Sequence, residues 1–484
     1  MFYKKYAFVT IAGFLLCACT SVPRDGEFSS VRDLVQQRIS QNIHWYQGGP
    51  TDEETRTSLD QLIKQPLTAT SAVQIALLNN QRLQAEFANL GIAQADLIKA
   101  GLLSNPILFT SIRFPKGGNG GNNVEFSLAK DFLDILLRPA RKQIAATEFE
   151  RTKLRVANAI LDLANDVQKS YYKVSGLHQL QSVMSLASDA AQNSYQLARK
   201  FDQAGNLSEL VLAQERSAAA EASAELLRTR MLAQEASNQL YRLLGISNQD
   251  ITWQTDTQLP EMPASEPDSD ALIQTALDQR LDLTAAKGEI DQMQTALDMT
   301  RDYRWVGSTS IGISTERDPD GSRVTGPNFT VELPVFDQHE SDIARMEALL
   351  EQSRSQYAAL QAEVRNDIES ALTHIESARQ IIALYNDELL PARDQVLKFT
   401  RQEQNYMLTD AFQLLYARQQ QILSYRNYIE SLTDYWVAKI DLARAMGAGL
   451  MVINDKPENL SQRKSTVQNS LLATTAVNKR GVTW

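Results

Sequence analysis

The chain of 484 residues carries the same layout twice, and this repetition constrains its fold more than any other feature. Ala72 to Gly245 matches Ala271 to Gly447 at an offset of about 200 residues, as expected for an internal duplication. Each half opens with an amphipathic stretch, continues with two short strand-like segments and closes with a long helical tract that turns back on itself. We therefore expect repeat 1 at residues 67–250, a linker containing several prolines at 251–267, and repeat 2 at 268–450.

Each half contains two strand-like segments, and the second segment of each half alternates strictly between apolar and polar residues. The segments are Ile107 to Phe114 and Val124 to Leu128 in repeat 1, and Val306 to Thr315 and Phe329 to Leu333 in repeat 2. A turn rich in Gly, Asn and Asp separates the two segments of each half. Strict alternation predicts one apolar and one polar face, so each half should hold a β-hairpin.

A long helical tract follows each hairpin, from about Pro139 to Asp202 and from about Ser341 to Asn405. Apolar residues recur every three or four positions in both tracts, which predicts a continuous buried stripe. At 1.5 Å per residue, each helix would be roughly 90 to 100 Å long. After a short break the chain returns through a second helix that ends at Gly245 or Gly447, because glycine is favoured there.

Four strands per chain are too few to cross a membrane alone, since the smallest membrane barrels have about eight. Open sheet edges in lipid would leave backbone groups unpaired. If the hairpins are membrane strands, several copies must share one barrel, and three copies would supply about twelve strands. The alternative is a pair of water-exposed hairpins that cap a long coiled coil.

The alternation also assigns directions to the side chains of such a barrel. Apolar residues of the second strands would face lipid: Val124, Phe126, Leu128, Phe329, Val331 and Leu333. Glu125, Ser127, Thr330 and Glu332 would then face the barrel lumen. Three copies each of Glu125 and Glu332 would make the outer mouth negative, although glutamates on a solvated surface explain the pattern equally well.

The N-terminus predicts export and lipidation. Lys4 and Lys5 precede an apolar run that ends in Leu16-Cys17-Ala18-Cys19, the pattern of a lipoprotein signal. We expect residues 1–18 to be a signal peptide and residues 19–66 to begin at a Cys19 that carries fatty acids such as palmitate. The alternatives are an ordinary signal cleaved elsewhere and a Cys-x-Cys metal site. The polar tail at 451–484 is predicted to be disordered or draped over the surface.

Composition excludes several classes of function. The net charge is -10, and no cluster of Lys and Arg with interleaved aromatics is present, so we expect no nucleic-acid partner. The four histidines have no partner at metal-ligand spacing, and no Ser-His-Asp set has a local signature. The sequence therefore predicts neither an enzyme nor a metal or cofactor site.

Three motifs carry a resemblance to a known family. They are the run from Gly326 to Asp337, which contains Leu-Pro-Val-Phe-Asp, the Leu-Leu-Pro-Ala-Arg at Leu389 to Arg393, and the Asp-Tyr-Trp-Val-Ala at Asp434 to Ala438. Together with the duplicated layout, they resemble the TolC-like outer-membrane efflux proteins, and in particular the lipid-anchored branch. Thr20 after Cys19 also resembles lipoproteins sorted to the outer membrane.

The resemblance implies a mainly α fold: a homotrimer with a twelve-stranded outer-membrane β-barrel continuous with a long periplasmic α-barrel. Family members dock onto a periplasmic adaptor protein and an inner-membrane pump, and they conduct substrates out of the cell. The expected function is therefore a passive exit duct of a tripartite efflux system. A non-conducting envelope scaffold and the outer-membrane component of a type I secretion system are the alternatives, and the sequence does not name the cargo.

The resemblance also suggests contact residues. The breaks between helices should form the tip that meets the adaptor, through Gly205, Leu207 and Ser208 and through Met407, Leu408 and Thr409. Ser208 and Thr409 are also expected to cap the returning helices. Phe412, Leu415 and Tyr416 stand where some members carry gate aspartates, so we expect a largely apolar periplasmic constriction. A plain capped turn and ordinary helix packing are the alternatives.

Overall fold

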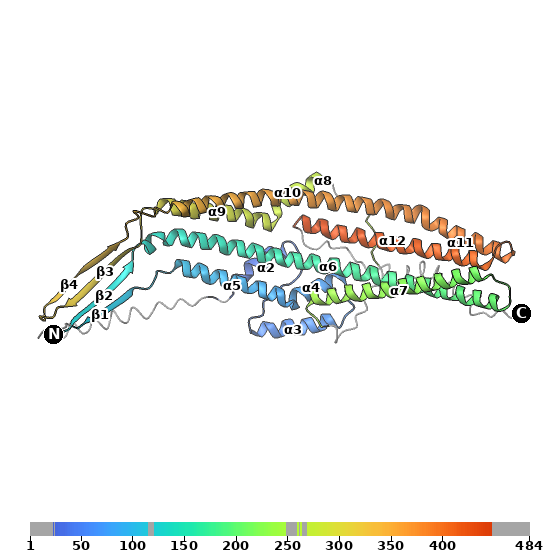
Figure 1. The fold of residues 1–484 in the computed structure, drawn as a ribbon, viewed down its shortest axis with the longest axis horizontal. Coiled ribbons are helices and arrows are strands. Elements are labelled where there is room, and N and C mark those ends of the chain that lie inside the picture. Colours follow the sequence, from blue (N-terminus) through green and yellow to red (C-terminus); the bar gives the residue numbers. More distant parts are fainter. Residues whose placement is uncertain are drawn as a thin grey trace. The chain divides into compact units, whose positions relative to one another are not determined.

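The computed structural model describes residues 23, 25–114, 121–247, 259–260, 262–263 and 269–447. Within these residues the fold is mainly helical with one small antiparallel sheet (Figure 1). The predicted signal peptide at 1–18, Cys19, the tail at 451–484 and most of the linker at 251–267 lie outside the described residues. No helix in the described part of the chain combines the length and the apolar character needed to cross a membrane.

Two helices, two strands and a long helical hairpin follow one another twice along the chain. Two short helices, α2 (Phe28–Gln36) and α3 (Pro50–Ile63), come first. The first series is then α4 (Ala69–Asn79), α5 (Gln81–Gly101), β1 (Ile107–Arg113), β2 (Asn123–Asp131), α6 (Leu133–Gln203) and α7 (Glu209–Leu244). The second is α8 (Ser269–Gln279), α9 (Leu281–Asp302), β3 (Thr309–Arg317), β4 (Arg323–Val331), α10 (Glu340–Leu384), the π-helical turn η1 (Tyr385–Leu389), α11 (Leu390–Asn405) and α12 (Ala411–Ala445).

The helix α6 is longer than the sequence predicts. It has 71 residues and begins at Leu133, so that Pro139 lies inside it instead of at its start. Proline is favoured in the first helical turn, which made Pro139 a reasonable but wrong boundary. The predicted stripe is confirmed at its centre, because Val156, Ile160 and Val167 are all buried.

The second long tract is not one continuous α-helix, contrary to the prediction. The turn η1 separates α10 from α11, and the Leu390 N–H donates to the carbonyl of Tyr385, five residues earlier. Pro391 has no N–H to continue the α-helical ladder, and a π turn is one way in which a helix accommodates such an interruption.

The four strands form a single sheet in the order β1-β2-β3-β4, with every neighbouring pair antiparallel. The two expected hairpins are thus joined, because β2 pairs with β3 from Val124 opposite Arg317 to Asp131 opposite Ser310. The strand β3 begins at Thr309 and β4 ends at Val331, so Val306, Glu332 and Leu333 lie outside the strands, contrary to prediction. Figure 1 shows the sheet at one end of α5, α6, α9 and α10.

The core lies along α6, which packs against α5, α7, α9 and α12. At its centre, Trp436 stacks on Tyr172 with ring centroids 5.5 Å apart, and the edge of Tyr435 meets Trp436 at 5.3 Å. The Trp436 indole N–H donates to the carbonyl of Pro260 over 2.9 Å. The Asp434 to Ala438 motif therefore holds α12 against α6 and fixes part of the inter-repeat segment.

Candidate functional site

The two central strands of the sheet, β2 and β3, have faces of opposite character. The register places Phe126, Leu128 and Ile313 on one face, and Glu125, Ser127 and Ser314 on the other. The apolar face is not covered by the described part of the chain, since Leu128 is 52% and Phe329 68% exposed. On the polar face the Asn328 side-chain amide donates to Ser127 Oγ over 3.1 Å. The central strands can therefore meet an apolar medium on one side and water on the other, while Ile107 and Phe109 of β1 add apolar side chains to the polar side.

The two predicted lumen glutamates lie at opposite ends of this sheet. Glu125 is near the hairpin turns, where an Arg113 Nη atom approaches its carboxylate at 3.1 Å. Glu332 follows the last residue of β4 at the helical end, and its carboxylate accepts hydrogen bonds from Ser308 N at 3.0 Å and from Ser308 Oγ at 2.8 Å. The expectation that both residues line one mouth is therefore wrong. Glu125 lies near the turn end of β2, and Glu332 lies just beyond the helical end of β4.

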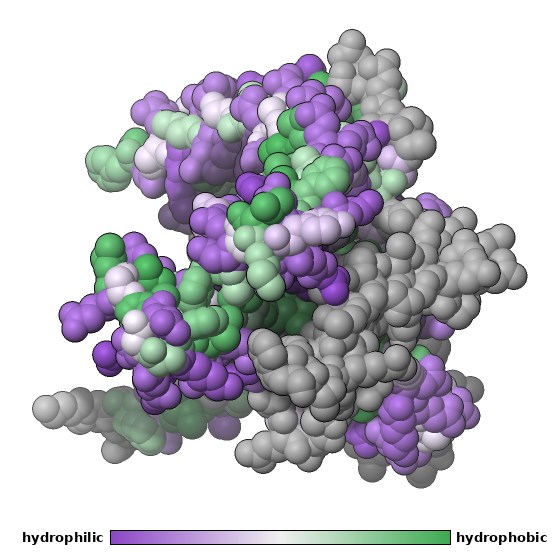
Figure 2. All heavy atoms as spheres, turned by 90° about the vertical axis from the view of Figure 1, so that its right-hand side faces the viewer, coloured by the Kyte–Doolittle hydropathy of each residue, from purple (hydrophilic) through white to green (hydrophobic). Residues whose placement is uncertain are grey.

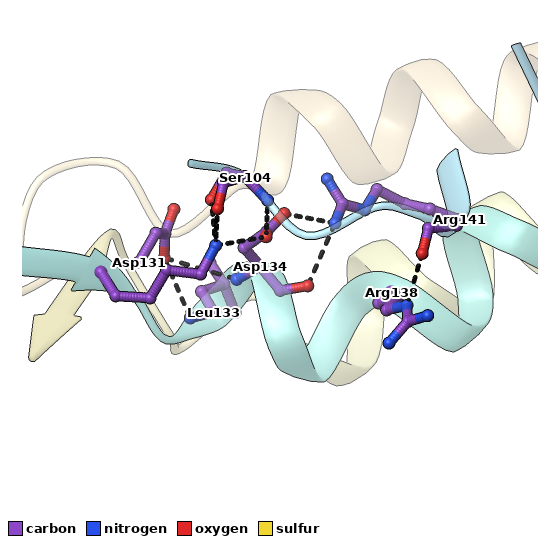
Figure 3. Close-up of polar contacts among 8 residues, drawn as sticks. Ser104, Asp131, Leu133, Asp134, Arg138 and Arg141 are labelled. Carbon is purple, nitrogen blue, oxygen red and sulfur yellow. Dashed lines mark hydrogen bonds and ion pairs between the residues drawn. The ribbon is translucent and has the colours of Figure 1, made fainter. Parts of the chain in front are cut away.

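Asp134 fixes the junction between the sheet and α6, a role that the sequence analysis missed (Figure 3). Its carboxylate accepts from Ser104 N at 2.8 Å and contacts Lys130 Nζ at 3.4 Å and the Arg141 guanidinium. The side chain is only 7% exposed. The hydrogen bond from the Ser104 backbone and the contact with Arg141 hold the pKa of Asp134 well below its usual range.

Neighbouring groups support the same junction. The Asp131 carboxylate accepts from Leu133 N at 3.0 Å, at the start of α6. The Arg138 Nε atom donates to the carbonyl of Gly101 over 2.7 Å and so ties α6 to the end of α5 (Figure 3). Asp134 in the first turn of α6 was a sequence signal for this role, but its backbone partner Ser104 lies in a separate segment.

The two breaks between helices are similar turns at the far end from the sheet (Figure 1). Asn206 N donates to the carbonyl of Phe201, and Leu408 N donates to that of Glu403, which is the six-to-one bond of a Schellman motif. Gly205 and Met407 occupy the left-handed position of these motifs, with φ of 72° and 59°. A non-glycine residue there is strained by about 1 to 2 kcal/mol.

The predicted caps are half correct. Ser208 Oγ accepts from Val211 N at 3.4 Å, as expected for the N-cap of α7. In the second turn Asp410, not Thr409, is the N-cap, and its carboxylate accepts from Gln413 N at 2.8 Å. Both residue types suit this position, so sequence alone did not separate them.

Exposure distinguishes the two tips. Leu207 is half-buried, whereas Met407 and Leu408 are 93% and 76% exposed. Figure 2 views the molecule from the side on which Figure 1 shows both turns, and apolar residues appear there among predominantly hydrophilic ones. The second tip therefore offers apolar side chains that nothing in the described chain covers.

The three predicted constriction residues have different surroundings. The Phe412 ring packs edge-on against Phe201 at 6.4 Å between centroids, which joins α12 to α6. Leu415 is half-buried, and Tyr416 is 60% exposed. The structure thus brings Phe412 into helix packing and leaves Tyr416 free to face solvent or another chain.

Further contacts hold the returning helices α7 and α12 together, farther from the turns than these residues. Arg426 in α12 pairs with Glu225 in α7 at 2.9 Å. A cluster of apolar residues lies beside this pair: Leu180, Val183, Met184, Leu226, Ile422 and Ile429. Within the second hairpin, the Gln421 amide contacts Asp394, and burial lowers the pKa of Arg418. Among the described residues, no group of three or more His, Cys, Asp or Glu could hold a metal ion.

No protein-family model matches the chain, and no curated protein matches its sequence. Solved structures do match its fold. The outer-membrane channel CmeC of Campylobacter jejuni aligns over 84% of this chain and 90% of its own, with 15% identity and a TM-score of 0.66. The outer membrane protein VceC of Vibrio cholerae aligns over 82% and 97%, with 16% identity and a TM-score of 0.63.

The outer-membrane channel MtrE of Neisseria gonorrhoeae, in its open state, aligns over 79% of this chain and 89% of its own, with 17% identity and a TM-score of 0.64. These matches confirm the mainly α fold that the TolC-like resemblance implies. The chain therefore has the fold of bacterial outer-membrane channels.

Proposed function

We propose that this chain is the outer-membrane exit duct of a tripartite efflux system and that it works as a homotrimer. The observation that carries the proposal is the four-stranded sheet, with its uncovered apolar face, its polar face and its two outer strands, β1 and β4. The likeness to solved outer-membrane channels supports the same role. The duct conducts passively and catalyses no reaction.

The sheet edges explain why copies should associate. In the described sheet, β1 and β4 each pair on one side only, so a single copy would leave their outer backbone groups without partners. In lipid each unpaired group costs several kcal/mol, which excludes an open sheet. Because the four strands alternate in direction, β4 of one copy can pair antiparallel with β1 of the next. Three copies then close a barrel of about twelve strands.

Strand length and side-chain direction fit this arrangement. The strands β2, β3 and β4 have nine residues each, and tilted membrane strands need about nine to eleven. Val124, Phe126 and Leu128 would face lipid, while Glu125 and Ser127 would face the lumen. The helices would continue the barrel as a hollow α-helical tube in the periplasm.

The remaining assignments follow from this placement. The tips, with Gly205, Leu207 and Ser208 in one turn and Met407, Leu408 and Thr409 in the other, would meet a periplasmic adaptor, which in turn engages an inner-membrane pump. Leu415 and Tyr416 would narrow the periplasmic entrance, and Phe412 would hold this part of α12 against α6 through its contact with Phe201. A lipidated Cys19 would add an anchor in the outer membrane.

Conductance and mass test the proposal together. The mature protein, purified in detergent, should have the mass of three chains, each of at most 54.1 kDa. In planar bilayers the parent protein should open rarely, and a Leu415→Ser, Tyr416→Ser variant should open more often. A trimer that never conducts, even with both substitutions, would favour a non-conducting scaffold. A monomer in detergent and in lipid would refute the shared barrel.

A further inference from the structure

Three charged side chains form a ladder across the polar face of the sheet, near the hairpin turns. Glu125 in β2 and Glu316 in β3 lie directly opposite each other in the register. Arg113 comes from β1, and its guanidinium approaches Glu125 at 3.1 Å and Glu316 at 3.9 Å. One arginine side chain therefore forms ion pairs with two carboxylates on adjacent strands.

Like charges directly opposite each other on neighbouring strands repel, because their Cβ atoms are only about 4.5 to 5.5 Å apart. The arrangement relieves this repulsion in two ways. Arg113 contacts both carboxylates, and the Asn123 side-chain amide donates to Glu316 over 2.6 Å. The same amide also donates to the Asp318 carboxylate over 3.3 Å, so it contacts both acidic side chains near the turn.

The ladder is accessible to water and to passing ions. The side chains of Arg113, Glu125 and Glu316 are 63%, 23% and 38% exposed. They share the face that carries Ser127 and Ser314, which is the lumen face in the proposed barrel. With Arg113 present, the three side chains carry one net negative charge per copy, and without it they would carry two.

We infer that Arg113 sets how strongly the outer mouth of the duct prefers cations to anions. This inference rests on the proposed function and deepens it, because it names the residue that limits the charge selectivity of the passage. In each copy, the positive charge of Arg113 offsets one of two carboxylate charges that would otherwise both attract cations. Cationic cargo is thus favoured only mildly, and anionic cargo is not strongly repelled.

The chain offers a matched control for the arginine. Arg323 in β4 lies at the same end of the sheet but on the other face. In the strand register it stands opposite Arg317, which in turn stands opposite Val124. The Arg323→Gln variant removes the same charge from the same end without changing the ladder. Arg113→Lys keeps the charge of the ladder and should behave like the parent protein.

The test is the reversal potential of single channels in planar bilayers under a KCl gradient around 0.1 M, where the Debye length is about 10 Å. Arg113→Gln should raise the permeability ratio of potassium to chloride by about two- to five-fold, since three extra negative charges act through water. Arg323→Gln should leave the ratio unchanged. In 1 M salt, where the Debye length is about 3 Å, the difference should largely vanish.

A second variant keeps the inference testable if Arg113→Gln does not assemble. Glu125→Gln leaves Arg113 paired with Glu316 alone, so it should lower the potassium preference below that of the parent. Channels in which these substitutions change selectivity no more than Arg323→Gln does would overturn the inference and leave the proposed duct intact. If neither the parent protein nor the Leu415→Ser, Tyr416→Ser variant forms channels under any condition, the duct is refuted, and this inference with it.

Discussion

Trp436 gives a direct test of how the two halves of the chain are held together. Its side chain is 3% exposed, and the planes of Trp436 and Tyr172 are inclined by only 17°. Replacing a buried Trp or Phe by Ala costs about 3 to 5 kcal/mol, because the transfer energy is lost and a cavity remains. Trp436→Ala should therefore lower the free energy of unfolding by that amount.

The change to phenylalanine separates the contributions. Trp436→Phe keeps most of the stacking area but removes the hydrogen bond to Pro260, so it should cost about 1 to 2 kcal/mol. Thermal unfolding in detergent, followed by far-ultraviolet circular dichroism, measures both variants. The shift in melting temperature is about 2 to 4 °C per kcal/mol for 150 to 250 residues and smaller for longer chains, so the alanine variant should melt several degrees, and at most about 20 °C, below the parent.

Trp305 is the matched control. It is 53% exposed, and the Arg304 guanidinium carbon lies 4.5 Å from the centroid of its ring. An exposed cation–π contact contributes about 0.5 to 1 kcal/mol, so Trp305→Ala should lower the melting temperature by only a few degrees. If the two alanine variants melt at the same temperature, the core assignment of Trp436 is wrong.

Three further predictions concern the junctions and turns. Gly176→Ala in α6 should cost about 1 to 3 kcal/mol, measured by chemical unfolding, because the added Cβ would overlap Thr433 of α12; a variant as stable as the parent would contradict the close packing. The pKa of Asp134 is lowered in the folded state, so this carboxylate stabilises the protein above its unfolded pKa of about 3.9, and the stabilisation is lost as the pH falls further. The difference in melting temperature between the parent and Asp134→Asn should thus be largest near neutral pH and shrink in acid, and a constant difference would rule out this ionic role. Met407→Gly should stabilise the second turn by about 1 kcal/mol and Met407→Val should destabilise it, since φ is positive there; equal melting temperatures of the two variants would show that the turn is not strained.

The sequence was sufficient for the features that local pattern encodes. The apolar stripe through Val156 and Ile160 is buried as predicted, and the Ser208 cap is where the capping rule put it. The helix α3 was missed although Pro50 and Asp52 are typical of a helix start, because only Asp52 and Leu59 of its residues are buried. A helix with so little apolar surface gives no periodic signal.

Features built from distant segments could not be read in this way. The pairing of β2 with β3 joins residues nearly two hundred positions apart, and strand alternation carries no information on which edge meets which. Asp134 and Ser104 likewise come together only because α5 and α6 both reach the sheet. Glu332 was misplaced for a different reason: the alternating sequence pattern continues to Leu333, but β4 ends at Val331, at the helical end of the sheet.

The most direct measurement of the central claim is the accessibility of single cysteines placed along β2. The sequence has two cysteines, both within the predicted signal and lipidation site, so each substitution would introduce one reactive thiol. Glu125→Cys and Ser127→Cys should react with a membrane-impermeant thiol reagent in reconstituted vesicles, while Phe126→Cys and Leu128→Cys should react only with a lipid-soluble one. A membrane strand that lines a water-filled passage predicts this alternation, and equal labelling of all four by the impermeant reagent would contradict it.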